Sequence, residues 1–335
     1  METSILDARA DLSKSVGVAV DLLRCNSVVA LPTETVYGLA GLALSPEAVA
    51  RIFEAKQRPS FDPLIVHIGA HEWLEKLVRV DRSEGALVSR LINSFWPGPL
   101  TILFPRTELV PDIVTAGSQN VAIRMPDHPI FAEVLRRLGE PLAAPSANRF
   151  GRVSPTRAED VLEELNGKIP LILDFGPTAV GLESTIVRLV KNQIEILRPG
   201  PITEEVLGGL APVSEPCGSS TVTAPGQMSS HYAPEKPVYL FDESDLTDHS
   251  KDAALICWGP AHDEARFLRV CSLSESYNLL EAAQRLFQLL REMDRAQNVN
   301  EIFVETVPER GLGKAIMNRV RRAFGGARKV RKVQP

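Results

Sequence analysis

Two cations stand one residue apart in the most chemically suggestive stretch of the sequence. Lys56 and Arg58 precede the rigid Pro59, and an acidic residue, Asp62, follows shortly after them. A lysine offers a point charge and an arginine offers a two-pronged donor, a combination that suits a polyphosphate. Both cations also follow a predicted helix, whose C-terminus favours positive charge for electrostatic reasons alone. Taken by itself, this stretch leaves both interpretations open.

Five further stretches place hydroxyl, amide or guanidinium groups among prolines and glycines at strand ends. They cover residues 31–39, 118–126, 143–156, 181–186 and 197–200. Arg124 ends a strand that is otherwise apolar, so it pairs with a buried acid or faces a ligand carboxylate or phosphate. The stretch at 143–156 can present hydroxyls and backbone N–H groups to an anion. Each stretch has an ordinary turn as its alternative, but six in one region indicate a ligand site.

Several common signatures are absent. The stretch from Gly311 to Lys314 lacks the upstream glycine and the following Ser or Thr of a P-loop. His67 and His71 are four residues apart, but the H-E-x-x-H pattern of zinc enzymes is missing. The chain has four cysteines without a C-x-x-C pair, which predicts neither a disulfide scaffold nor a zinc ribbon. No residue is therefore predicted to bind a metal.

The elements that carry these stretches are short and proline-rich. Of the 25 prolines, 21 lie in residues 1–234, where they favour short elements joined by rigid turns. Apolar runs and helical periodicity predict an α+β fold with a mixed, twisted sheet and flanking helices. The predicted strands are 28–31, 64–67, 100–104, 121–124, 142–144, 171–174, 184–189 and 194–198. The predicted helices are 5–24, 46–55, 72–78, 83–95, 130–138 and 157–165.

The residue composition changes after residue 205. Residues 206–237 are rich in Gly, Ser, Thr and Pro without a regular period, which predicts a linker. Residues 238–335 are predicted to form a small α/β domain with strands at 238–241, 254–258, 267–271 and 301–304. A strongly amphipathic helix is predicted over 279–293 and another over 313–324.

The composition is that of a globular protein. The chain has 335 residues, of which 44% are hydrophobic and 24% charged, and its formal net charge is −5. This balance disfavours a protein coated in basic charge for nucleic acid. The sequence has no long uncharged apolar run and no positively charged leader, so we expect a cytoplasmic protein without a membrane segment.

The polar stretches together resemble the YrdC-like family in its long, two-domain form, the threonylcarbamoyl-AMP synthases. The lysine–arginine pair Lys56/Arg58 and the serine–asparagine pair Ser146/Asn148 match the family pattern. Further matches cover residues 32–38, 96–101, 124–126 and 184–185, and residues 231–234 match the family's linker. Two positions differ, because the family usually has asparagine where this chain has Asp62 and threonine or serine where it has Asn120. The resemblance implies a YrdC-like catalytic domain over 1–205, a linker over 206–237 and a Rossmann-like accessory domain over 238–335.

The resemblance also implies a reaction. L-threonine, bicarbonate or CO2, and ATP would give L-threonylcarbamoyl-AMP and pyrophosphate, and a second enzyme would transfer the threonylcarbamoyl group to adenosine beside the anticodon of tRNA. A threonine carbamate can attack the α-phosphate without an enzymic nucleophile, so positioning and charge neutralisation would suffice. Mg²⁺ is expected to accompany ATP with few protein ligands.

Residue roles follow from the resemblance position by position. Lys56 and Arg58 are the expected catalytic residues, which stabilise charge on the phosphates. The expected L-threonine ligands are Thr35, His67, Arg124, Ala144 and Ser184. The expected ATP ligands are Arg58, Asp62, Asn120, Ser146, Asn148, Ser154, Arg198 and Tyr232. Because Tyr232 belongs to the linker, we expect the linker to act as a lid over the site.

Two other functions remain as alternatives at this stage. One is a non-enzymatic RNA-binding protein, and the other is a carbamoyltransferase that handles a carbamoyl-adenylate. Residues 311–335 carry eight cations and no acid, which leaves −13 on the remaining 310 residues. These cations could bind tRNA or an acidic partner, or form a solvated end. The accessory domain could stabilise the chain, regulate the lid, form a dimer or dock the transfer enzyme.

Overall fold

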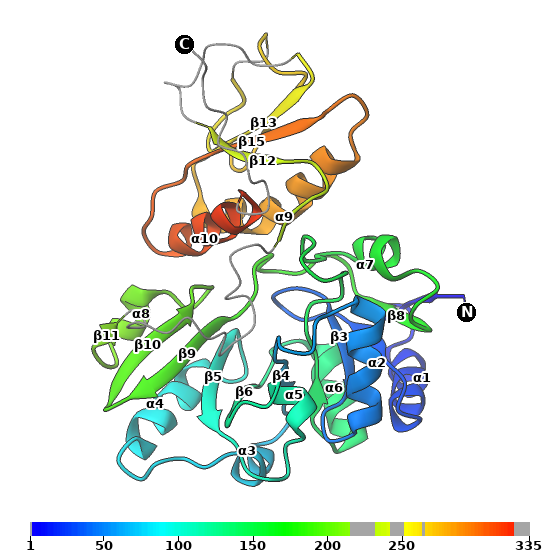
Figure 1. Cartoon of the computed structure of the whole chain (residues 1–335), viewed down its shortest axis with the longest axis vertical. Coiled ribbons are helices and arrows are strands. Elements are labelled where there is room, and N and C mark those ends of the chain that lie inside the picture. Colours follow the sequence, from blue (N-terminus) through cyan, green and yellow to red (C-terminus); the bar gives the residue numbers. More distant parts are fainter. Residues whose placement is uncertain (1, 215–231, 242–250, 263–264, 325–335) are drawn as a thin grey trace. The chain divides into compact units, whose positions relative to one another are not determined.

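The chain folds into two compact units (Figure 1). The computed structural model describes residues 2–214, 232–241, 251–262 and 265–324. Within these ranges, the first unit takes residues 2–150 and 154–214, whereas the second takes 151–153 and the described residues from 232 onward. Residues 215–231 of the predicted lid and residues 325–335 of the cationic segment 311–335 lie outside the described part of the chain.

A mixed sheet forms the centre of the first unit. Its eleven strands follow the order β1-β8-β2-β3-β7-β4-β6-β5-β9-β10-β11 and include both parallel and antiparallel neighbours. This arrangement confirms the predicted mixed sheet with flanking helices. The strands are β1 Ser4–Asp7, β2 Val29–Leu31, β3 Gly38–Leu42, β4 Ile65–His67, β5 Leu100–Pro105, β6 Asn120–Arg124, β7 Leu142–Ala143, β8 Leu171–Asp174, β9 Thr185–Val190, β10 Gln193–Arg198 and β11 Val213–Ser214.

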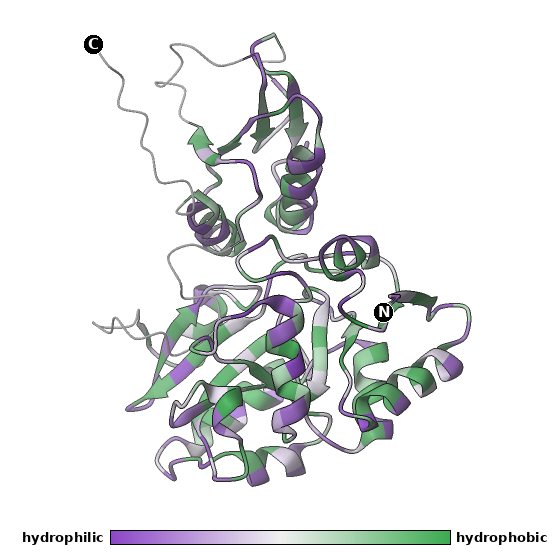
Figure 2. Ribbon diagram, turned by 45° about the vertical axis from the view of Figure 1, so that its right-hand side comes forward, coloured by the Kyte–Doolittle hydropathy of each residue, from purple (hydrophilic) through white to green (hydrophobic). Residues whose placement is uncertain are grey.

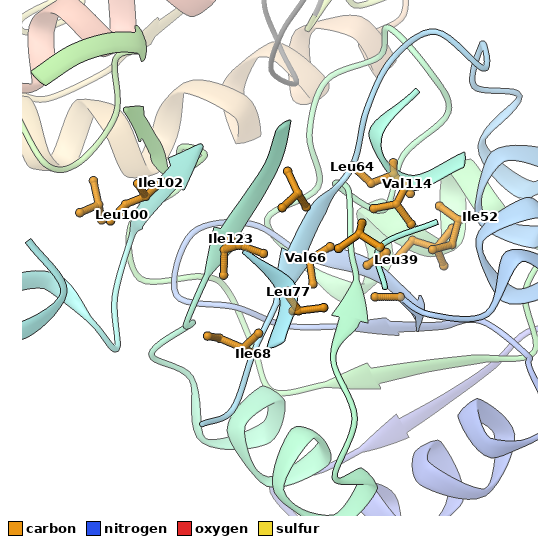
Figure 3. Packing of buried hydrophobic residues seen from close by; sticks show 14 of the residues in the cluster. Leu39, Ile52, Leu64, Val66, Ile68, Leu77, Leu100, Ile102, Val114 and Ile123 are labelled. Atoms are coloured by element: carbon orange, nitrogen blue, oxygen red, sulfur yellow. The ribbon is translucent and has the colours of Figure 1, made fainter. Parts of the chain in front are cut away.

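Helices cover both faces of this sheet. Successive strand residues point to opposite faces, and Ala30 and Leu39 accordingly belong to one apolar cluster while Leu31 and Ala40 belong to another. Figure 3 shows part of the first cluster, in which Leu39 lies near Ile52. The helices of this unit are α1 Leu12–Arg24, α2 Pro46–Lys56, α3 His71–Leu77, α4 Gly85–Phe95, α5 Asp112–Thr115, α6 Pro129–Leu138, α7 Ala158–Leu165 and α8 Glu204–Gly208.

Helix α2 delivers the lysine of the first polar stretch. Ser45 caps its first turn by accepting a hydrogen bond from the Ala48 amide, and Pro46 occupies the first helical position. The helix buries its apolar face against β3 and ends at Lys56. Gln57 follows in the left-handed conformation with φ of 52°, which turns the chain away from the helix axis. Local sequence signals thus place Lys56 at a fixed point of the fold.

The structure corrects three predicted elements. The helix predicted over 5–24 is wrong at its start, because Ser4–Asp7 forms β1 beside β8 and α1 begins only after the Asp11 cap. Strand β3 was not predicted, since its Gly38–Leu42 sequence lacks the β-branched residues that usually indicate a strand. Helix α8 begins at Glu204 and extends into the residues predicted to be linker, strand β11 lies wholly within them, and β11 pairs with β10.

The second unit contains a four-stranded parallel sheet in the order β12-β15-β13-β14, which confirms the predicted Rossmann-like α/β domain. The amphipathic helix predicted over 279–293 is α9, which buries Leu286, Phe287 and Leu290 on one side. Figure 2 shows purple and green faces on the helices of both units. The elements are β12 Val238–Phe241, β13 Ala253–Cys257, β14 Arg269–Ser272, α9 Leu279–Arg295, β15 Glu301–Glu305 and α10 Leu312–Phe324.

None of the helices in the described ranges combines the length and the apolar character that a membrane crossing requires.

Candidate functional site

Three neighbouring strands of the first unit align polar side chains in register. Arg124 ends β6, and it lies opposite His67 of β4 on one side and Thr101 of β5 on the other. All three residues are buried, with exposed fractions of 4%, 2% and 0%. Buried polar groups at aligned positions of adjacent strands are costly unless they are paired. This row is the first part of the candidate site.

Arg124 is held from three directions. Its guanidinium donates to the Thr35 hydroxyl at 3.0 Å and to the Gly98 carbonyl at 3.3 Å. It also pairs with the Glu34 carboxylate at 2.6 Å. The Thr35 hydroxyl lies 2.7 Å from that of Thr33, which itself bonds the loop backbone. Arg124 thus has the buried acid that the sequence suggested, and that acid occupies a position where a ligand carboxylate could bind instead.

His67 is neutral at physiological pH. Burial, reinforced by the nearby charge of Arg124, lowers its pKa to about 3. The imidazole packs against Phe131 with ring centroids 5.1 Å apart. The Ala144 amide donates to the carbonyl of Ile65, which belongs to β4 as His67 does, so the main chain of Ala144 lies beside β4. A neutral ring in an apolar setting suits recognition of a small substrate rather than charge neutralisation.

A hydroxyl pair connects the strand row to a second arginine. The Ser184 hydroxyl lies 2.7 Å from that of Thr101. Arg198 donates to the Ser184 hydroxyl at 3.0 Å and to its carbonyl at 2.9 Å. Close packing around Gly200 fixes this corner, because a Cβ there would lie 2.5 Å from the Thr185 amide nitrogen. These contacts connect four of the five expected threonine ligands. Thr35 and His67 neighbour Arg124 directly, and Ser184 is connected to Arg124 through Thr101.

Lys56 and Arg58 form a second polar group at the end of α2. The Lys56 ammonium is buried and donates to the main-chain carbonyls of Ser146 and Asn148. Arg58 pairs with Asp62 at 2.8 Å and also donates to the carbonyl of Pro63 at 2.7 Å. The contact of Lys56 with 146–148 joins the two short pairs that the sequence resemblance had singled out. The structure therefore brings together Lys56, Ser146 and Asn148.

The electrostatics of this group are dominated by burial. Burial, followed by the nearby charge of Arg58, holds the pKa of Lys56 well below its usual value. Burial also raises the pKa of Asp62, against the opposing effect of Arg58, Lys56 and Arg198. The three cations act on a single carboxylate, so their fields overlap at Asp62. Such an arrangement attracts an anion with several negative charges.

The remaining expected nucleotide ligands are dispersed. The Asn148 amide donates to the Arg149 carbonyl at 2.7 Å, and the buried Ser154 hydroxyl bonds the carboxylate of Glu183. Asn120 begins β6, roughly 13 Å along the strand from Arg124 at about 3.3 Å per residue. The structure thus places Asn120 at the other end of this strand from the row of buried polar residues.

Tyr232 belongs to the second unit in this structure. It is 1% exposed, stacks on Phe287 with ring centroids 5.6 Å apart, and lies beneath the Arg319 guanidinium at 5.3 Å. The lid that the sequence predicted for the linker stays a prediction, since residues 215–231 lie outside the described ranges. Within the second unit, α9 and α10 supply the residues that hold this tyrosine.

Three site residues were not singled out from the sequence. Glu34 lies within the polar stretch 31–39, Glu183 within the stretch 181–186, and Thr101 within a matched family segment, but none was assigned a role. The sequence could have indicated Thr101, because it is a hydroxyl residue between Leu100 and Ile102 in a predicted apolar strand; the structure buries it fully. The roles of Glu34 and Glu183 became visible only through their bonded partners.

The mixed sheet and this set of buried cations and hydroxyls define a YrdC-like domain. Residues 21–200 match the family model described as "Telomere recombination", and residues 191–325 match that of "Threonylcarbamoyl-AMP synthase, C-terminal domain". The chain is 39% identical to the threonylcarbamoyl-AMP synthase of Pyrococcus abyssi over 96% of this chain and 98% of that one. It is 37% identical to that of Bacillus subtilis, over 96% of each.

Solved structures agree with the family match. A double-substitution variant of P. abyssi Sua5 superposes with a TM-score of 0.85 at 34% identity and covers 96% of both chains. P. abyssi Sua5 complexed with L-threonine gives a TM-score of 0.81 at 38% identity, over 92% of this chain and 94% of that one. The chain belongs to the threonylcarbamoyl-AMP synthase family.

Proposed function

We propose that the chain is an L-threonylcarbamoyladenylate synthase, a nucleotidyltransferase that acts in tRNA modification. The observation that carries the proposal is that one unit contains two buried polar groups. One is Arg124 with its hydroxyl neighbours, and the other is Lys56 with Arg58. Threonine requires a cation for its carboxylate, and ATP requires cations for its phosphates. The near full-length identity to threonylcarbamoyl-AMP synthases supports the same assignment.

The amino acid would bind on the strand row. Its carboxylate would pair with Arg124 and displace Glu34, which now occupies that position at 2.6 Å. The neutral ring of His67 would contact the side chain, and the Ser184 hydroxyl, held by Thr101, would bind a polar group. The main chain at Ala144 would complete the set. These groups position a small zwitterion without offering it a nucleophile.

The reaction would proceed without a covalent enzyme intermediate. The threonine nitrogen attacks CO2 derived from bicarbonate and loses a proton, which gives a carbamate. A carbamate oxygen then forms a bond to the α-phosphorus of ATP while the bond to the β-phosphate oxygen breaks, and pyrophosphate leaves. Lys56, Arg58 and Arg198 would neutralise the charge that develops on the phosphates, and the buried setting strengthens their effect.

Mg²⁺ would enter as part of the ATP substrate. The carboxylates in the described site are engaged by protein groups: Glu34 by Arg124, Asp62 by Arg58 and Glu183 by Ser154. These residues do not form a cage of oxygen ligands for a resident ion. The nucleotide phosphates and water would therefore supply most of the magnesium ligands.

Pyrophosphate release tests the proposed reaction. Purified protein should release pyrophosphate from ATP only when threonine and bicarbonate are both present, and mass spectrometry should find threonylcarbamoyl-AMP. A variant at an exposed lysine, Lys168→Ala, should retain full activity. Equal release without threonine would overturn the substrate assignment, and salt-sensitive RNA binding without any release would favour the RNA-binding alternative.

The partners of the reaction follow from its product. Threonylcarbamoyl-AMP would pass to an enzyme that transfers the threonylcarbamoyl group to tRNA, which places the protein in the cytoplasm. Direct tRNA binding by the basic end and dimerisation through the second unit stay predictions. Of the eight cations in 311–335, Arg321 pairs with Glu309 and Arg319 is buried over Tyr232, so part of that charge is engaged within the protein. Deleting residues 326–335 and measuring tRNA affinity would test the remainder.

A further inference from the structure

The second unit carries a cluster of three chemically different side chains that the proposed reaction does not use. Cys257 ends β13 and Glu305 ends β15, and these strands are parallel neighbours in register. Their carboxyl ends meet at one edge of the sheet, which is where open α/β sheets bind ligands. His262 lies five residues beyond Cys257, in the loop that leaves the same edge.

His262 contacts both of the other side chains. The Cys257 Sγ lies 3.1 Å from Nδ1 of His262, and the His262 Nε2 lies 2.9 Å from Oε1 of Glu305. One ligand atom from each residue can be chosen so that all three lie within 4.8 Å of one another. The second Glu305 oxygen accepts a hydrogen bond from the Trp258 amide at 2.6 Å, which orients the carboxylate. This outer contact resembles those that fix metal ligands in place.

Burial decreases across the cluster from the thiol to the imidazole. Cys257 is 0% exposed, whereas the side chains of Glu305 and His262 are 18% and 43% exposed. The innermost group is therefore a soft sulfur ligand, and the outermost is an imidazole that an ion can reach from solvent. A thiolate, an imidazole and a carboxylate are the three side-chain ligands that Zn²⁺ uses.

We propose that Cys257, His262 and Glu305 bind one Zn²⁺ ion. Tetrahedral zinc with bonds of 2.0–2.3 Å needs its ligand atoms about 3.3–3.8 Å apart. Cys257 and Glu305 now contact opposite ring nitrogens of His262, Nδ1 and Nε2. An ion bound at Nδ1 beside the thiol therefore requires the thiol and imidazole to part by a few tenths of an ångström and the Glu305 carboxylate to leave Nε2 and move to the Nδ1 side of the ring. Three protein ligands leave the fourth position to water. This proposal does not depend on the proposed reaction. The sequence predicted no metal ligands, because no short spacing motif connects these three residues.

The test uses the full-length protein after a chelator has removed any bound metal and the chelator itself has been removed. Zn²⁺ titrated against a chromophoric competitor should bind at one ion per chain. Co²⁺ should give the visible bands of a tetrahedral site together with a near-ultraviolet thiolate-to-metal band. Cys257→Ser should abolish the thiolate band, and His262→Gln and Glu305→Gln should each weaken Zn²⁺ binding at least tenfold. His262→Gln is the most informative variant, because its partly exposed side chain can change without disturbing the core.

Matched cysteine controls separate this site from general thiol binding. Cys25→Ser, at an exposed position of the first unit, and Cys271→Ser, on the neighbouring strand β14, should bind Zn²⁺ like the unmodified protein. Circular dichroism of every variant checks that the fold persists. Equal Zn²⁺ affinity in the unmodified protein and in folded His262→Gln would overturn the proposal. A Co²⁺ complex without a thiolate band would overturn it as well and would leave the trio as a hydrogen-bonded cluster alone.

Discussion

Replacing Lys56 by methionine tests the phosphate-binding group most directly. Methionine is similar in length but has no charge and cannot donate to the carbonyls of Ser146 and Asn148. Each buried carbonyl left without a partner costs about 1–3 kcal/mol. The substitution also removes the desolvation penalty of a buried ammonium, which offsets part of this loss. We therefore expect the free energy of unfolding to fall by about 2–4 kcal/mol.

The catalytic loss should be larger than the stability loss. A preorganised cation at a developing phosphate charge contributes about 3–4 kcal/mol to the transition state, or about 100- to 1,000-fold in kcat. Pyrophosphate release by folded Lys56→Met protein, compared with Lys168→Met at an exposed position, measures this factor. Lys56→Arg should recover little, because a planar guanidinium does not fit a pocket shaped for an ammonium between two carbonyls.

The same variant gives a pH signature. Since burial and Arg58 depress the pKa of Lys56 in the folded protein, the unfolded chain binds more protons between that value and 10.5. The stability of the unmodified protein should therefore rise relative to Lys56→Met as the pH rises through this interval. Urea unfolding at pH 7 and pH 9.5 measures the difference. A pH-independent difference, or pyrophosphate release within tenfold of normal, would refute the reasoning.

Three further substitutions probe the remaining contacts. The pKa of His67 is about 3 in the folded protein, below its usual 6.5, so below pH 6.5 the unfolded chain binds a proton that the folded protein does not. The free energy of unfolding should therefore fall by about 3 kcal/mol between pH 6.5 and pH 4, and urea titrations of His67→Gln should show a smaller fall. Asp62→Asn removes a negative charge beside Arg58, so the KM for ATP should fall severalfold in steady-state kinetics; a higher KM would contradict this. Thr101→Val removes the hydroxyl partner of Ser184, so thermal unfolding should show a loss of about 1 kcal/mol, and the KM for threonine should rise; unchanged values would argue against the link.

Local sequence patterns were sufficient for most elements of the fold. The Ser45-Pro46 cap and the apolar spacing of α2 predicted a helix that ends beside Lys56, and the structure has that helix. Strand β8 likewise stands where its apolar run predicted it. These elements were predictable because capping and burial of one face depend on residues close in sequence. Strand β1 was mispredicted because its partner β8 lies more than 160 residues away.

The sequence by itself determined which residue types are available, and the resemblance assigned most of their roles. The tertiary structure decided which of them meet. Strand register put Thr101 and His67 on either side of Arg124, and sheet order joined Thr101 to Ser184. Strand pairing also brought Cys257 next to Glu305 across 48 residues of sequence. Side-chain contacts of this kind depend on pairing between distant strands, which no local pattern encodes.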